Sequence, residues 1–264
     1  MDTSAAPSKL HSIERVRHEL VRRQLTVKSV VNVTPNMVRV TLTGESLKGF
    51  VSASYDDHVK IFVPNGDKAH ELPPEEAKVG RDYTPRRYDA STNELDIDFA
   101  IHDAGPATAW AMKTSPGDTL EIGGPRGSFV VADDFDWYLF VGDETALPAI
   151  GRRLEELRAG AKATVIAEVT GKSEEQTFTS KATFDVTWLH RGAQEAGTTT
   201  LADDAVRKLT LPQGDGYVWV GYESGTAKRL RQILVDEKSH PKAWVKAAGY
   251  WRRGTANVHD SHND

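Results

Sequence analysis

The chain contains 264 residues, no cysteine, and a formal net charge of −5 from 33 basic and 38 acidic side chains. Its length fits one large domain or two of ordinary size, and its 39% hydrophobic content is enough to build a core. The absence of cysteine excludes disulfide scaffolds, thiolate metal sites, Cys-ligated iron–sulfur clusters and thiol nucleophiles. The mild acidity argues against nucleic-acid binding. The sequence has no apolar run long enough to cross a bilayer and no secretory signal, so we expect a cytoplasmic protein.

Residues 1–24 form a lead-in to the first domain. Residues 1–10 are small and polar, and we expect them to be disordered. The following segment, 11–23, is basic, and Ile13, Val16 and Leu20 have the spacing of one helix face. We interpret it as a short solvated helix or a lead-in strand.

Residues 25–131 have the pattern of a compact antiparallel barrel. Strands are predicted at residues 25–33, 37–43, 58–63, 81–88, 94–101 and 119–122, with one short helix at residues 106–114. The first two strands flank the turn Thr34-Pro35-Asn36, which is a hairpin signal. Many short strands with one small helix are typical of a closed all-β domain.

Residues 132–264 have a different pattern, with longer and more apolar strands, and end in a hydrophilic tail. Buried strands are predicted at residues 136–142, 163–169, 185–189 and 217–222, and helices from residue 147 to Gly160 and at residues 226–237. This alternation predicts an open α/β domain with a mainly parallel sheet.

The segment from Arg81 to Tyr88 (RDYTPRRY) combines an aromatic ring with several cations. In a regular strand Arg81 and Tyr83 share one face, and Thr84 points to the other. A flat anionic cofactor suits such a group, because the ring can stack and a guanidinium can pair with phosphate. An edge strand carrying solvated charges would give the same pattern.

Three glycine-marked junctions are further candidates for a ligand site. Gly105-Pro106 opens a helix whose free N–H groups could hold a pyrophosphate. Residues 123–129 (GGPRGSF) allow close backbone approach to a ligand, or form an interdomain turn. Residues 142–149 leave the first buried strand, where open α/β sheets bind nucleotides, although Asp143 and Thr145 could simply cap the next helix.

Taken in order, these motifs resemble one protein family. The segments RDYTPRRYD, DFAIHDAGPATAWA, PGDTLEIGGPRGSF, FVGDETALPAI and YWRRG are similar to those of the siderophore-interacting proteins, flavin-dependent ferric-siderophore reductases of the ferredoxin-reductase-like superfamily. The likeness runs from about Leu25 to Gly254. It implies a six-stranded FAD-binding barrel followed by an NAD(P)H-binding α/β domain.

The resemblance also implies roles for individual residues. Arg81 would hold the flavin phosphate, Tyr83 would stack on the isoalloxazine, and Thr84 would hydrogen-bond near the flavin N5. Its backbone or a strand twist would bring Thr84 to the face of Tyr83. No other catalytic residue is implied. The remaining FAD contacts would come from His102, Gly105, Pro106, Ala107, Gly127 and Ser128, and the nicotinamide side from Asp143, Glu144 and Thr145.

The reductant is expected to be NADPH or NADH, with NADPH favoured. Arg191 and Lys172 follow two buried strands and could bind a 2′-phosphate, or could be solvated loop cations. The family's fourth strand usually ends in a Gly-Glu pair, whereas this chain has Tyr222 before Glu223. We assign Glu223 to the nicotinamide side. Tyr222 leaves the access of the nicotinamide open.

The implied reaction moves electrons from NAD(P)H through FAD to chelated Fe(III), releasing Fe(II). Flavin suits it because it exchanges both hydride and single electrons. A ferric siderophore of catecholate or hydroxamate type would need cations nearby, and the candidates, which could also be solvated surface charges, are Lys60, Arg126, Arg252 and Arg253. We expect a monomer without a resident metal ion and without nucleic-acid or membrane partners. The alternatives are a siderophore-binding flavoprotein without turnover and a flavin reductase that serves a partner protein.

Overall fold

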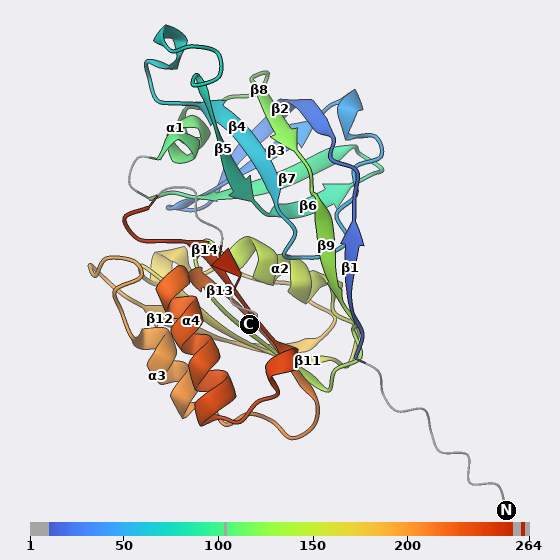
Figure 1. Cartoon of the computed structure of the whole chain (residues 1–264), viewed down its shortest axis with the longest axis vertical. Helices are drawn as coiled ribbons and strands as arrows, with labels where there is room; N and C mark the ends of the chain where they lie inside the picture. The colour runs from blue at the N-terminus through green and yellow to red at the C-terminus, as the bar shows by residue number, and fades with distance from the viewer. Residues whose placement is uncertain (1–10, 103–104, 256–259, 262–264) are drawn as a thin grey trace, which may run out of the picture.

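The computed structural model describes residues 11–102, 105–255 and 260–261. The expected disorder of residues 1–10, and two positions of the HDAGP segment, Asp103 and Ala104, lie outside these ranges. An antiparallel sheet forms the N-terminal part and a mainly parallel sheet forms the C-terminal part (Figure 1). None of the helices in the described ranges has the length and apolarity needed to cross a membrane.

The N-terminal sheet has seven strands and curls on itself, which confirms the predicted barrel class. Across the sheet the strands are β5 (Lys78–Tyr83), β4 (Val59–Pro64), β8 (Thr119–Gly123), β2 (Arg22–Thr34), β3 (Met37–Thr43), β7 (Glu94–Ala100) and β6 (Pro85–Asp89). Apolar side chains such as Val40, Leu42 and Ile61 are fully buried in its interior. The two edge strands, β5 and β6, follow each other in the chain and are separated by Thr84 alone.

The prediction of one strand from residue 81 to 88 was wrong, and the break explains the seventh strand. Tyr83 pairs with Val59 of β4, whereas Pro85 pairs with Ile97 of β7 on the other side of the sheet. Proline has no N–H to donate and restricts the residue before it to extended conformations, so a strand readily ends at Thr84. The alternation of side chains between the two faces of a strand, which placed Tyr83 and Thr84 on opposite faces, therefore does not continue beyond the end of β5.

The basic N-terminal segment forms a strand, not a helix. β1 (Ile13–Arg17) pairs antiparallel with β9 (Gly127–Val131), which runs on from the barrel toward the second sheet (Figure 1). A Cβ atom at Gly127 would lie 2.4 Å from the backbone oxygen of Val16. The glycines of this segment suggested a close approach between the backbone and a ligand. At Gly127 the close approach is instead to β1 of the same chain.

The C-terminal sheet has five parallel strands, as its class predicts, and one short antiparallel strand. Its order is β12 (Thr183–His190), β11 (Lys162–Val169), β10 (Trp137–Asp143), β13 (Gly216–Glu223), β14 (Val245–Trp251) and β15 (Asp260–Ser261). Counted along the domain, the parallel strands have the order 3-2-1-4-5. Such a sheet binds ligands where the order reverses, outside the carboxyl ends of β10 and β13.

Helices cover both faces of this sheet. α2 (Leu147–Glu156) packs on the face that carries Phe140, and α3 (Leu201–Lys208) and α4 (Ser224–Gln232) pack on the face that carries Val141. The apolar run of β10 reflects this burial on both sides. Sequence patterns did not predict α3 or β14.

The two sheets share a continuous apolar core. Met37, Tyr55 and Ala100 of the N-terminal part belong to the same buried cluster as Phe140 and Leu147 of the C-terminal part. Burial of a common apolar surface fixes how the two parts sit against each other.

Polar contacts across this junction occur on two sides. Arg86 of β6 forms two hydrogen bonds with Glu155 of α2, at 2.9 and 2.6 Å. On the other side Glu174, in a 3-10 turn at Lys172–Glu174, accepts hydrogen bonds from the Thr34 hydroxyl at 2.6 Å and from the Asn36 backbone and side chain at 3.1 and 2.9 Å. We call this second contact the Glu174 clasp. It ties the β2–β3 turn to the parallel sheet.

His11 joins the lead-in to the C-terminal part. Its side chain is 4% exposed and bonds to Asp134 through Nδ1 at 2.8 Å and to Asp215 through Nε2 at 3.0 Å, while its ring stacks on Phe135 at 4.0 Å. Burial lowers the pKa of His11, but the hydrogen bonds and charges of the two aspartates outweigh it, and the pKa is raised overall. Two carboxylates facing both ring nitrogens favour the imidazolium.

This contact predicts a pH-dependent stability. Because the folded pKa lies above the unfolded value, His11 stabilises the fold most at low pH and loses that contribution as the pH rises through the folded pKa. His11→Phe keeps a ring on Phe135 and should reduce the free energy of unfolding by about 1 kcal/mol at pH 6, with the difference shrinking toward pH 9. Denaturant unfolding at both pH values measures this. His190→Phe, which removes a histidine pair with Glu175, is the control, and an equal loss at both pH values for His11→Phe would contradict the assignment.

Candidate functional site

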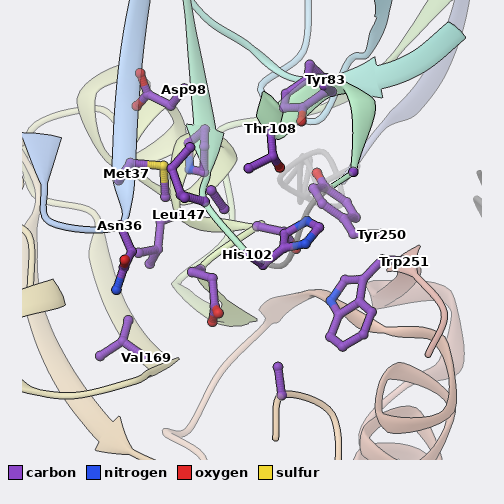
Figure 2. Close-up of a pocket in the computed structure, with 18 of the residues that line it drawn as sticks. Asn36, Met37, Tyr83, Asp98, His102, Thr108, Leu147, Val169, Tyr250 and Trp251 are labelled. Carbon is purple, nitrogen blue, oxygen red and sulfur yellow. The ribbon is translucent and has the colours of Figure 1, made fainter. Parts of the chain in front are cut away.

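A cavity of about 880 Å³ lies between the two sheets. Its walls come from the β5–β6 seam, the start of α1 (Pro106–Lys113), the carboxyl ends of β10, β11 and β14, and the loop after β12. Figure 2 shows aromatic and polar side chains, among them Tyr83, His102 and Trp251, on one side and Met37 and Leu147 on the other.

Arg81, Tyr83 and Thr84 all line this cavity. Thr84 sits where the two edges of the barrel meet and is buried. The Tyr83 ring packs on Phe99 with their centroids 4.4 Å apart, and burial raises the pKa of its phenol well above the usual value. Tyr83 therefore presents a neutral aromatic face. Arg81 is half-buried, and its Nη1 donates to the Gly80 carbonyl at 2.8 Å.

The start of α1 forms the adjoining wall. His102, Gly105, Pro106 and Ala107 all line the cavity. Gly105 is the N-cap residue, no side chain among the described residues caps the helix, and a Cβ at Gly105 would meet nothing within 4 Å of the described atoms. The N–H groups and the dipole of a helix start favour an anionic ligand. An aromatic face, a guanidinium and a helix start fit the ring and phosphates of FAD.

The carboxyl end of β10 lies opposite. Glu144 and Thr145 line the cavity, whereas Asp143 lies beneath the surface and is 2% exposed. Asp143 accepts hydrogen bonds from the backbone and hydroxyl of Thr145, at 2.9 and 2.5 Å, and from Nε1 of Trp251 at 2.8 Å. Burial raises the pKa of Asp143, with a further rise from the charge of Glu144. Asp143 acts through its neighbours and does not face the cavity itself.

The two candidate cations for a nucleotide phosphate differ in position. Arg191 lines the cavity and forms a two-pronged ion pair with Glu144, one contact of which measures 2.8 Å. Lys172 is exposed on the 3-10 turn after β11 and does not line the cavity. Arg191 is thus committed to a carboxylate, although at a place that a ligand could reach.

Glu223 and Tyr222 lie away from the cavity. The Glu223 side chain caps α4 by accepting from the Thr226 backbone at 2.9 Å. Tyr222 is 1% exposed, packs among the side chains of α3 and α4, and donates its hydroxyl to Glu168 at 2.8 Å. Because its side chain lies on the face covered by α3 and α4, Tyr222 does not obstruct the carboxyl ends of the strands.

Gly127 and Ser128 also lie outside the cavity lining. Ser128 is buried on β9, where its hydroxyl donates to Asp57 at 2.6 Å, accepts from the Ala53 backbone at 3.1 Å and contacts Nε2 of His18 at 2.7 Å. These contacts give Ser128 a structural role in joining β1, β9 and the segment before β4.

The four candidate substrate cations form two groups. Arg252 and Arg253 line the cavity. Lys60 lies just behind the wall, with Nζ 2.7 Å from Oδ1 of Asp82, a lining residue. Arg126 is exposed in the loop after Gly123, the cross-strand partner of Lys60, and is not part of the lining.

Much of the acidic charge in the wall is neutralised by cations of the chain. Ion pairs join Asp56 to Lys246, Asp82 to Lys60, Asp98 to Arg39 and Glu144 to Arg191. Arg252 and Arg253 add positive charge to the lining of the cavity. Among the described residues, no group of three or more His, Asp or Glu side chains is arranged to hold a metal ion.

Sequence reasoning missed two aromatic residues of the site, Tyr250 and Trp251. Both stand in the YWRRG segment, which drew attention only for its arginines. Two adjacent aromatic residues after the small, apolar stretch Ala247–Gly249 were the available signal.

Comparisons with known proteins identify the family of both parts of the chain. Residues 26–129 match the model described as the siderophore-interacting FAD-binding domain, and residues 135–254 match the siderophore-interacting protein model. The chain is 36% identical over 252 residues to the NADPH-dependent ferric-chelate reductase of Escherichia coli strain K12, covering 90% of this chain and 96% of that protein. It is 35% identical to the ferric vibriobactin reductase ViuB of Vibrio cholerae, covering 84% and 86%.

A solved structure gives the same result. The siderophore utilization protein from T. fusca superposes with a TM-score of 0.88 at 37% identity, covering 95% of this chain and all of that one. The resemblance read from the motifs is confirmed, and the chain belongs to the siderophore-interacting protein family.

Proposed function

We propose that this protein is a reductase that takes electrons from NADPH and passes them through FAD to Fe(III) held in a siderophore, so that Fe(II) is released. The observation that carries the proposal is that one cavity joins Arg81, Tyr83 and Thr84, the start of α1 and the carboxyl ends of the parallel strands. The names of the E. coli and V. cholerae relatives support the same activity. We place the reaction in the cytoplasm, where reduced nicotinamide nucleotides are available.

The residues of the chain bind and orient the reactants. Arg81 and the first turn of α1 would hold the FAD phosphates, and Tyr83 would support the flavin ring. Bound FAD supplies the conversion of a two-electron hydride donor into a one-electron donor. No side chain needs to act as an acid or base toward the iron, because reduction itself weakens the hold of hard oxygen ligands on the metal.

Arginines in the cavity lining support a ferric siderophore as the substrate. Catecholate and hydroxamate siderophores present dense oxygen surfaces, often with negative charge, and Arg252 and Arg253 lie where such a chelate would approach the flavin. Arg126, which is exposed, would extend this cationic surface along the barrel, whereas Lys60 would act as a pair with Asp82. The name of the V. cholerae relative points to such a ferric siderophore complex as substrate.

Kinetics with and without chelate test the function. NADPH oxidation by the FAD-loaded protein should depend on a ferric catecholate or hydroxamate, with two Fe(II) trapped for each NADPH consumed. Absence of turnover with every chelate would indicate a siderophore-binding protein, and turnover only with an added protein acceptor would indicate a flavin reductase. NADPH should give a higher kcat/KM than NADH, and Arg191→Ala should reduce that preference; an equal effect on both nucleotides would remove Arg191 from this role.

Arg81→Ala should weaken FAD binding. The loss of a charge-assisted contact to phosphate corresponds to about 1.5–3 kcal/mol, or roughly ten- to hundred-fold in Kd. Fluorescence titration of the apoprotein with FAD measures this. Arg207→Ala, which removes an exposed guanidinium paired with Glu237 on the far side of the parallel sheet, is the matched control. Unchanged affinity in Arg81→Ala would exclude Arg81 from the phosphate site.

Arg253→Ala should affect the iron substrate only. Arg253 is exposed at the cavity mouth, so its loss should raise KM for an anionic ferric chelate roughly three- to ten-fold. Stopped-flow reduction of the flavin by NADPH should be unchanged, and Arg207→Ala should change neither quantity. An unaltered KM, or slower flavin reduction, would move the substrate site away from Arg253.

A further inference from the structure

The indole of Trp251 is held at the carboxyl end of the parallel sheet by a buried carboxylate. Trp251 ends β14, is half-buried and lines the cavity. Its Nε1 donates to Oδ2 of Asp143, 2.8 Å away, at the end of β10. Since β13 lies between β14 and β10, the side chain reaches across the end of one whole strand.

An irregularity in β14 directs Trp251 into the cavity. Gly249 pairs with Tyr222, and the next pair is Trp251 with Glu223, so Tyr250 is an extra residue on β14. In a regular strand Tyr250 and Trp251 would point to opposite faces, whereas here both line the cavity, side by side in Figure 2. Bulges of this kind are uncommon between parallel strands and often re-aim a side chain next to a functional site.

The other edge of the indole is limited by Gly197 in the loop after β12. Gly197 has a φ of +74°, and a Cβ there would lie 3.1 Å from Cη2 of Trp251 and 2.9 Å from Cγ of Glu223. The indole of Trp251 is thus hydrogen-bonded through Nε1 on one edge and closely packed against Gly197 on the other. These two restraints hold the indole in one orientation.

The ring lies where the strand order of the parallel sheet reverses. β10 and β13 are neighbours whose connections run to opposite sides, and ligands of such sheets sit in the crevice outside their carboxyl ends. Glu144 and Thr145 open this crevice on the β10 side, and Trp251 covers it on the β14 side. A planar group entering here meets the indole.

We propose that Trp251 is the stacking surface for the pyridinium ring of the oxidised nicotinamide nucleotide, and that Asp143 and Gly197 are the positioning residues that hold it. The proposal rests on the proposed function, because it names the residue that contacts the nicotinamide once its hydride has been donated. A cation is attracted to the face of an aromatic ring, most strongly to that of tryptophan. The oxidised ring carries a positive charge and the reduced ring does not, so Trp251 favours the oxidised form.

Calorimetric titration of the FAD-loaded protein tests this directly. The two probes are NADP⁺ and 2′-phospho-AMP, which lacks the nicotinamide half. Trp251→Leu should weaken NADP⁺ binding roughly ten-fold and leave the affinity for 2′-phospho-AMP within about two-fold of wild type. Trp251→Phe keeps a ring and should stay within about three-fold for both probes.

Two further variants separate positioning from general damage. Asp143→Asn presents an N–H group to the indole N–H and should weaken NADP⁺ binding about three-fold, again without affecting 2′-phospho-AMP. Trp188→Phe alters a half-buried tryptophan of β12 that packs on Phe178 outside the cavity, and it should change neither affinity. The visible spectrum of bound FAD reports whether each variant is folded.

The outcomes are distinct. If Trp251→Leu binds NADP⁺ as wild type does, or loses affinity for both probes equally, Trp251 is not the stacking surface. If only the flavin spectrum changes, Trp251 contacts the flavin and the proposal is overturned. If the wild-type protein binds neither NADP⁺ nor 2′-phospho-AMP, the proposed function fails, and this inference fails with it.

Discussion

The meeting of the two barrel edges at Thr84 is the constraint on which the rest of the site depends. A seven-stranded sheet whose first and last strands are separated by one residue can curl only with that residue at the seam. Tyr83 and Thr84 therefore lie at the end of the barrel that faces the parallel sheet. Two residues later, Arg86 binds Glu155 of α2, so the chain that forms the seam also anchors the second sheet against it.

The charge of the cavity is determined as much by pairing as by composition. Asp82 and Asp98 would repel an anionic ligand, but Lys60 and Arg39 neutralise them within the wall. The chain can thus carry a net charge of −5 and still present arginines at the opening. Counting charges along the sequence does not reveal this, because each pair joins residues far apart in the chain.

Local patterns predicted the elements, and non-local contacts account for what they missed. Alternating strands, the run of β10 and the Gly-Pro start of α1 are local, and they led to both sheets and to most of the cavity. The pairing of β1 with β9 joins segments about a hundred residues apart, so the glycine at 127 was interpreted as a ligand contact. The partner of Arg191 likewise lies 47 residues away. Trp251 was missed because a bulge, which alternation cannot anticipate, turns it into the cavity.

The Glu174 clasp has a consequence for how ligands reach this cavity. With the hairpin turn tied to the parallel sheet on one side and Arg86 tied to α2 on the other, the two sheets cannot swing apart as a hinge without breaking these hydrogen bonds. These contacts hold the walls together, so we expect a bulky chelate to bind at the mouth. Fixed walls do not prevent electron transfer, because the iron does not have to enter the cavity: an electron can pass from a ring bound inside it to iron bound outside.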